Sequence, residues 1–216
     1  MTDKGLFVVF EGGDSVGKST QVAWLAASLA QAGVPHTVTF EPGATWVGVR
    51  VRDMVLNPTS GPICPRAEAL LYIADKAQHV TEIIEPALDA GQVVVSDRYT
   101  DSVIAYQGAG RELDGDDIAH LSTWATGGLR PDLTVLLDAD PGEAVETIAS
   151  KDRLEGAGLE LHRRARERFL ELAAADPDHY LVLPARDERQ TIAAAVRARL
   201  EDFGLELPAP SGMIEP

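Results

Sequence analysis

The chain has 216 residues, 45% of them hydrophobic, which is enough for one domain with a full hydrophobic core. Its net charge of -15 argues against a nucleic-acid or anionic-membrane surface, because both need dense Lys and Arg, and no apolar run approaches the roughly 18 residues that span a bilayer. Cys64 is the only cysteine, so an internal disulfide is excluded, a reducing compartment is favoured, and we expect a cytoplasmic protein with no nucleic-acid or membrane partner.

Short apolar runs alternate with longer helical patterns along the chain. The runs predict strands at 6–10, 36–40, 92–95, 133–137 and 180–183. The patterns between them predict helices at 18–32, 46–56, 65–90, 114–126, 141–149, 160–175 and 188–203. Pro86 is expected to kink or end the third helix, because proline lacks an amide and clashes with the preceding turn. The alternation predicts an α/β fold in which helices cover both faces of a five-stranded parallel sheet.

The last predicted helix ends at Gly204, a favourable residue just past a helix C-terminus. The segment beyond it, LELPAPSGMIEP, is proline-rich, acidic and without periodicity. We therefore expect a single domain over residues 1–204 and a mobile C-terminal tail over residues 205–216.

The stretch FEGGDSVGKSTQ at residues 10–21 matches G-x-x-x-x-G-K-[ST]. In this motif backbone amides cradle phosphates, the lysine reaches the outer oxygens, and the hydroxyl ligates Mg²⁺. A predicted strand precedes the motif and a predicted helix follows it, which is the context that the motif requires. The sequence therefore predicts a three-layer α/β/α P-loop fold. The nucleotide-binding loop would contain Gly12, Gly13, Asp14, Ser15, Val16, Gly17, Lys18, Ser19 and Thr20.

Charged residues also follow the other predicted strands. Glu41 follows the second strand, Asp97 and Arg98 follow the third, and Asp138 follows the fourth. Open parallel sheets bind ligands beyond the C-terminal ends of their strands, so we expect these residues to meet at one site. The competing interpretation is that strand ends are polar simply because they reach solvent.

Six stretches of the chain resemble the thymidylate kinase family, P-loop enzymes that pass a phosphoryl group from ATP to dTMP. The stretches are FEGGDSVGKSTQ at 10, EPGAT at 41, RAEALLYIADKAQHV at 66, DRYTDSVIAYQGAGR at 97, PDLTVLLD at 131 and DRLE at 152. They occur in the family's order, and the stretch that begins at Asp97 is the most specific. The resemblance implies an ATP- and Mg²⁺-dependent dTMP kinase of dTTP biosynthesis. It also implies a homodimer with the third helix as a candidate interface, although the apolar face of that helix could equally be internal core.

The resemblance assigns roles to the loop and to the third strand end. Backbone amides and Lys18 would hold the donor phosphates, Ser19 would ligate Mg²⁺, and Asp97 would hold the metal's water shell. Arg98 would contact the acceptor phosphate. Asp14 would accept a hydrogen bond from the 3′-hydroxyl of the acceptor sugar, which explains a carboxylate in a phosphate loop; capping of local amides is the alternative.

A lid at about residues 149–160 is implied as well, with glycines that suit a hinge. Its closure would bring Lys151 or Arg153 onto the migrating phosphoryl group. Arg153 is favoured, because family members whose loop lacks a basic residue supply this cation from the lid, and position 15 is Ser here. A solvated charged loop is the alternative. The catalytic set implied by the resemblance is Lys18, Arg98, Arg153 and Asp14.

For the acceptor, the resemblance implies stacking of the base on Tyr72, pairing of Gln107 with the base edge, and exclusion of a ribose 2′-hydroxyl by Tyr106. Lys76 stands where the family usually has an arginine that donates to the base, and Arg52 where it uses a phosphate-binding arginine. A surface salt bridge is the competing interpretation for Arg52 and Arg98. The full substrate-binding set is Asp14, Glu41, Arg52, Tyr72, Lys76, Arg98, Ser102, Tyr106 and Gln107.

Four of the departures from the family's usual pattern bear on the identity of the acceptor: Phe40, Trp46, Lys76 and Val103. They leave open a kinase for another or a modified pyrimidine nucleoside monophosphate. A non-catalytic P-loop nucleotide sensor is the alternative from a different class, although the Asn-Lys-x-Asp motif of guanine-nucleotide switches does not occur.

Overall fold

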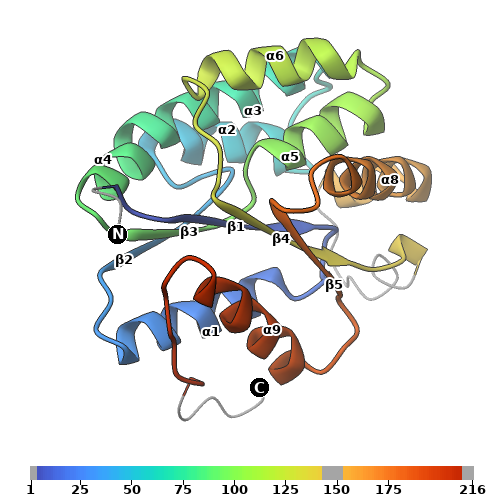
Figure 1. Cartoon of the computed structure of the whole chain (residues 1–216). Coiled ribbons are helices and arrows are strands. Elements are labelled where there is room, and N and C mark those ends of the chain that lie inside the picture. Colours follow the sequence, from blue (N-terminus) through green and yellow to red (C-terminus); the bar gives the residue numbers. More distant parts are fainter. Residues whose placement is uncertain (1–3, 143–152, 211–216) are drawn as a thin grey trace.

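The computed structural model describes residues 4–142 and 153–210, and it shows a central sheet between two layers of helices (Figure 1). All five strands are parallel, in the order β2-β3-β1-β4-β5. The strands are β1 (Phe7–Gly12), β2 (His36–Phe40), β3 (Val93–Asp97), β4 (Leu133–Asp138) and β5 (Tyr180–Pro184). The predicted α/β class and five-stranded parallel sheet are therefore confirmed.

Helices cover both faces of the sheet, as Figure 1 shows. Below it in this view lie α1 (Lys18–Gln31) and α9 (Arg189–Glu201). Above it lie α2 (Trp46–Leu56), α3 (Pro65–His79), α4 (Glu85–Asp89), α5 (Thr100–Val103), α6 (Gly115–Ala125) and α8 (Leu159–Ala175). This layering explains the unbroken apolar runs of the strands, because each strand buries both of its faces.

Strand β1 illustrates the two-sided burial. Val8 and Phe10 belong to the core cluster that includes Leu25 and Leu29 of α1. Phe7 and Val9 point to the opposite side, into a cluster with Ile84 and other residues of the upper layer. Successive side chains of a strand point to opposite faces, so the run Phe7 to Phe10 anchors the phosphate loop to the cores on both sides of the sheet.

The third predicted helix is longer in the sequence pattern than any single helix in the structure. It runs as α3 to His79, continues as a π-helical turn over Val80–Ile84, and ends as α4 at Asp89. The backbone N–H of Glu85 donates to the carbonyl of Val80, five residues back. Since Pro86 has no amide hydrogen, the turn before it changes its hydrogen-bond register instead of ending.

One helical segment was not predicted from the sequence. Residues Thr100–Val103 form α5, and the chain continues as a π-helix over Ile104–Gly110. Nearly every side chain in this segment is buried, and the π-helix packs against α8 and α6. A helix that is buried on all sides lacks the one-sided apolar periodicity by which sequence analysis finds helices.

Several predicted features fall partly outside the described residues. Residues 143–149 of the predicted fifth helix, and 149–152 of the predicted lid, are among them, as are 211–216 of the predicted tail. Leu205 and Leu207, at the start of the predicted tail, pack partly buried against the core beside α1 and α9. Within residues 4–142 and 153–210, no helix has both the length and the apolar character needed to cross a bilayer.

Candidate active site

The phosphate loop joins the end of β1 to the start of α1. Gly12 has φ 131°, and a Cβ there would lie 2.3 Å from the carbonyl oxygen of Leu137 in β4. Only glycine therefore lets the chain turn this close to the neighbouring strand. Gly17, with φ 91°, caps α1, so that the helix begins at Lys18 with the positive end of its dipole at the loop. A helix start of this kind attracts phosphate.

Lys18 is buried beside the loop. Its Nζ donates to the carbonyl of Gly13 and, at 3.3 Å, to the carbonyl of Gly12. Burial, reinforced by the charge of Arg98, lowers the pKa of Lys18 to about 8. The next residue, Ser19, donates its hydroxyl to Oδ2 of Asp97 over 2.7 Å. The structure thus brings together the ammonium of Lys18, the hydroxyl of Ser19 and the carboxylate of Asp97 at the start of α1.

Arg98 links the loop to the end of β3. It has φ 75°, a conformation that non-glycine residues adopt at some energetic cost and that is common at functional sites. Its Nη1 donates to the carbonyl of Gly12 (2.9 Å) and to the hydroxyl of Ser102 (3.0 Å), and its Nη2 donates to Asp14 Oδ1 (2.5 Å). The guanidinium is therefore held in place before any ligand binds.

Asp14 is the loop residue on the other side of this ion pair. Burial alone would raise its pKa, but the charges of Arg98, Lys18 and His162 outweigh burial and hold the pKa below its ordinary value. Its second oxygen, Oδ2, accepts a hydrogen bond from the Tyr106 hydroxyl at 3.4 Å. Asp14 is therefore an ionised acceptor at neutral pH.

A cleft of about 180 Å³, which we call the central cleft, opens beside Asp14. It is lined by Asp14, Glu41, Pro42, Arg52, Leu56, Tyr72, Arg98, Tyr99, Ser102, Val103, Tyr106, Gln107 and Leu154. Eight of the nine substrate-binding residues expected from the sequence are in this lining, although they come from five separate stretches of the chain. The exception is Lys76.

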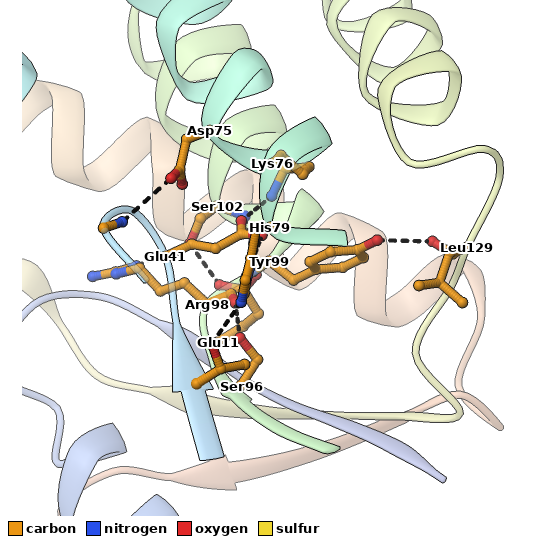
Figure 2. A network of polar contacts seen from close by, with 12 residues as sticks. Glu11, Glu41, Asp75, Lys76, His79, Ser96, Arg98, Tyr99, Ser102 and Leu129 are labelled. Carbon is orange, nitrogen blue, oxygen red and sulfur yellow. Dashed lines mark hydrogen bonds and ion pairs between the residues drawn. The ribbon is translucent and has the colours of Figure 1, made fainter. Parts of the chain in front are cut away.

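Lys76 is completely buried and does not belong to the lining of the cleft; Figure 2 shows it in a polar network with Glu41. Its ammonium pairs with Oε2 of Glu41 and lies 4.5 Å from the ring centroid of Tyr99. The other oxygen of Glu41 is 2.8 Å from Nδ1 of His79, whose Nε2 is 2.5 Å from the hydroxyl of Thr39. Lys76, Glu41, His79 and Thr39 form one buried polar network, so in this structure Lys76 meets a carboxylate of the protein and not the interior of the cleft.

Glu11 is a second buried carboxylate, and sequence analysis missed it. Its Oε1 accepts the backbone N–H groups of Tyr99 (2.8 Å) and Ser102 (3.2 Å), and its Oε2 accepts the Ser102 hydroxyl at 2.6 Å (Figure 2). Burial, together with the charge of Asp101, raises the pKa of Glu11 to about 7. These three hydrogen bonds clamp Glu11 to the residues that follow Arg98. The sequence signal that could have revealed this clamp is a carboxylate at the end of an otherwise apolar strand.

The described end of the predicted lid lies on the cleft side of the site. Leu154 lines the cleft, and Arg153 donates through Nη2 to the carbonyl of Ile63 at 3.3 Å. Nη2 of Arg153 is also 3.8 Å from Oε2 of Glu68. Arg111 binds Glu68 as well, through Nε at 2.9 Å and Nη2 at 3.0 Å. Lys151, the other candidate lid cation, lies outside the described residues.

An all-parallel α/β sheet, a phosphate loop after its first strand, and an arginine-lined cleft beside that loop together define a P-loop nucleotide phosphotransferase. The particular family follows from comparison with known proteins. A sequence profile described as "Thymidylate kinase" matches residues 10–196. The chain belongs to the thymidylate kinase family, and it is a nucleoside monophosphate kinase that phosphorylates dTMP.

Individual relatives are similar along almost their whole length. A thymidylate kinase from Cutibacterium acnes is 60% identical over 91% of this chain and 96% of its own. One from Clavibacter michiganensis subsp. michiganensis is 52% identical over 91% of this chain and 95% of its own. The crystal structure of thymidylate kinase from Ehrlichia chaffeensis matches with a TM-score of 0.75 at 29% identity, covering 91% of this chain and 99% of that one.

Proposed function

We propose that the chain transfers the γ-phosphoryl group of ATP to dTMP and releases dTDP and ADP. The donor phosphates bind in the loop of residues 12–20, and dTMP binds in the central cleft. One observation carries this assignment: the cleft and the loop share Asp14, and Arg98 spans them by bonding to both Gly12 and Asp14. A donor and an acceptor bound in these two places would meet at Arg98.

On the donor side, Lys18 and the loop amides hold the outer phosphates. The Ser19 hydroxyl and the Asp97 carboxylate fit Mg²⁺, because both offer hard oxygen ligands and they already lie 2.7 Å apart. Ser19 would hold the ion directly and Asp97 would hold its water shell. Mg²⁺ bound there supplies charge neutralisation on the donor phosphates.

On the acceptor side, the ring of Tyr72 stacks on the base and the Gln107 amide pairs with the base edge. Tyr106 leaves no room for a ribose 2′-hydroxyl, and the ionised Asp14 accepts a hydrogen bond from the 3′-hydroxyl. Arg98 and Arg52 take the acceptor phosphate; Arg52 lines the cleft and donates through Nη1 to the Pro42 carbonyl over 2.8 Å.

Lys76 acts on the acceptor indirectly in this proposal. Its ammonium neutralises Glu41, and the pKa of Glu41 lies below its ordinary value because Lys76 and His79 outweigh the effect of burial. Glu41 lines the cleft, so the buried network fixes the position of one of its walls. Lys76 and Glu41 are thus positioning residues for acceptor binding.

Phosphoryl transfer asks little covalent chemistry of the protein, so alignment and charge stabilisation dominate. Arg98 contributes both, because it is fixed at the junction of loop and cleft. Arg153 joins it when the lid, about residues 149–160, closes over ATP. This closure would separate Arg153 from Glu68 and pair it with the migrating phosphoryl group instead.

We further propose a single kinase domain over residues 1–204 that works in the cytoplasm as a homodimer. The cytoplasm fits a chain whose one cysteine, Cys64, is free and exposed. The homodimer is supported by large apolar side chains that helices of the upper layer leave exposed. These include Val49 of α2 (55% exposed), Leu70 of α3 (54%) and Trp124 of α6 (77%).

Isothermal titration of dTMP into the protein without ATP tests the acceptor assignment. Tyr72→Ala should weaken dTMP binding by about 1–3 kcal/mol, the usual contribution of base stacking on an aromatic ring. Trp46→Ala is the matched control, because Trp46 is 67% exposed and does not line the cleft. Equal affinity for dTMP in the wild type and Tyr72→Ala would refute the placement of the base in this cleft.

A further inference from the structure

His162 is a buried side chain that none of the roles above uses. It lies in the first turn of α8, with a side chain only 3% exposed. Its Nδ1 is 3.9 Å from Oδ2 of Asp14. Its Nε2 is buried and has no hydrogen-bond partner among the described residues. When protonated, a buried imidazole 3.9 Å from a carboxylate forms an ion pair with it. In either protonation state, Nε2 is a buried polar atom that lacks a hydrogen bond among the described residues.

His162 lines a small cavity of about 20 Å³ beside the phosphate loop. Asp14 faces it from the loop, with Arg98 bonded to the far oxygen of Asp14. The Tyr106 ring of the π-helix stands edge-on at 6.0 Å. Asp138 of β4 and Arg166 of α8 also line the cavity, but they form an ion pair with each other at 2.7 Å.

Asp101 of α5 and Tyr180 of β5 are two more titratable groups on neighbouring elements. Asp101 accepts a hydrogen bond from the Tyr180 hydroxyl at 2.7 Å. Among the described residues, the carboxylate that lies within ion-pair distance of His162 is Asp14, so a charge on His162 interacts most directly with Asp14.

The two oxygens of Asp14 consequently have different surroundings. Oδ1 is held by Arg98 at 2.5 Å, while Oδ2 faces the Tyr106 hydroxyl and His162. In the proposed function Arg98 also has to serve the acceptor phosphate. A second cation on the Oδ2 side would keep the carboxylate in place while Arg98 shares its donors, and would add positive charge close to an acceptor that carries nearly two negative charges at neutral pH.

We propose that His162 is a positioning residue for the acceptor nucleotide, and that its protonated ring holds Asp14 in the orientation that receives the sugar 3′-hydroxyl. This inference rests on the proposed function, in which Asp14 binds that hydroxyl. It predicts that acceptor affinity depends on the protonation of His162, while the chemical step does not.

The test compares KM and kcat for dTMP and for its 3′-deoxy analogue, at about pH 6 and about pH 8.5. His162→Gln removes the charge, and His162→Phe keeps a ring packed against Tyr106. Asp14→Asn is the reference variant. Glu167→Gln is the matched control, because it changes a charge on the exposed face of the same helix.

Both His162 variants should raise KM for dTMP about three- to tenfold at the lower pH, with kcat nearly unchanged, and the ratio to wild type should fall toward unity at the higher pH. The ratio should be smaller for the 3′-deoxy analogue. The acceptor's own ionisation is common to all variants and cancels in these ratios.

A KM ratio that is independent of pH and equal for the two acceptors would mean that His162 only packs, and would overturn the inference. If Asp14→Asn separates the two acceptors but the His162 variants do not, the inference fails while the role of Asp14 stands. If Asp14→Asn fails to separate them, the proposed role of Asp14 falls, and this inference falls with it.

Discussion

At the scale of single residues, the site is a set of charges that are already paired before a ligand binds. Arg98 holds Asp14, Lys76 holds Glu41, and Lys18 lies over the carbonyls of its own loop. In a chain with a net charge of -15, anions can be bound only where a few cations are placed and kept charged. The paired arrangement keeps these cations in position at the cost of some competition with the ligand.

The Lys76 and Glu41 pair gives a prediction about stability. Lys76 is fully buried, so Lys76→Met leaves Glu41 without its strongest partner and should lower the free energy of unfolding by about 3–5 kcal/mol. Urea unfolding measures this loss. The double variant Glu41→Gln and Lys76→Met should lose less than the sum of the two single variants. A loss below about 1 kcal/mol in Lys76→Met would contradict the buried pair.

At the scale of elements, Glu11 fastens β1 to the start of α5 by accepting two backbone N–H groups and a hydroxyl. This clamp determines where Arg98 lies, because Arg98 stands between Asp97 of β3 and the residues that Glu11 holds. The hydrogen bonds that Glu11 accepts favour its ionised form, but burial and the charge of Asp101 outweigh them and raise its pKa.

Glu11 therefore makes stability depend on pH. Its pKa is about 7 in the folded chain against an ordinary value of 4.5, so the folded state binds more protons between these two pH values. Stability that is present below pH 4.5 is then lost as the pH rises through 7. Glu11→Gln stays neutral and should avoid about 3 kcal/mol of this loss.

Chemical unfolding of wild type and Glu11→Gln between about pH 5 and pH 8 provides the measurement. The difference between the two proteins reports Glu11 together with its interaction with Asp101, while Asp75, whose pKa is also raised, is present in both. Parallel stability profiles would show that Glu11 is ionised across this range.

Sequence analysis found the strands and most helices because each has a clear apolar pattern, and it found the phosphate loop because glycine spacing is dictated by the backbone. It also named nine residues as substrate-binding, through family resemblance, and eight of these line the cleft. It missed the helical segment after Tyr99, which is buried on all sides, and the network of Glu41, Lys76 and His79. Side-chain partners from distant strands and helices leave no local signal in a sequence.

At the scale of the whole molecule, helices α2, α3 and α6 lie on the same side of the sheet (Figure 1), and each carries an exposed apolar side chain. Part of α3 is internal core, since Ala69, Tyr72 and Ile73 are buried, but Leu70 points outward. A surface of this kind is what an isologous dimer would cover.

We predict that sedimentation at micromolar concentration gives twice the chain mass of 23.1 kDa, and that Leu70→Glu combined with Trp124→Glu shifts the protein to the monomer, because burying two carboxylates in an apolar interface is unfavourable. Val182→Glu is the matched control, because Val182 is 44% exposed on β5. A wild type that sediments as a monomer would contradict the proposed dimer.

The central claim is that this loop and cleft together phosphorylate dTMP. Its most direct measurement is ADP release with ATP and Mg²⁺, using dTMP, dUMP, dCMP, the ribose analogue of dTMP and thymidine as acceptors, with Lys18→Ala beside the wild type. We predict the fastest turnover with dTMP, and a loss of at least about 100-fold in Lys18→Ala, because the lysine stabilises charge on the transferred group. Equal turnover in Lys18→Ala, or no turnover with any acceptor, would contradict the account.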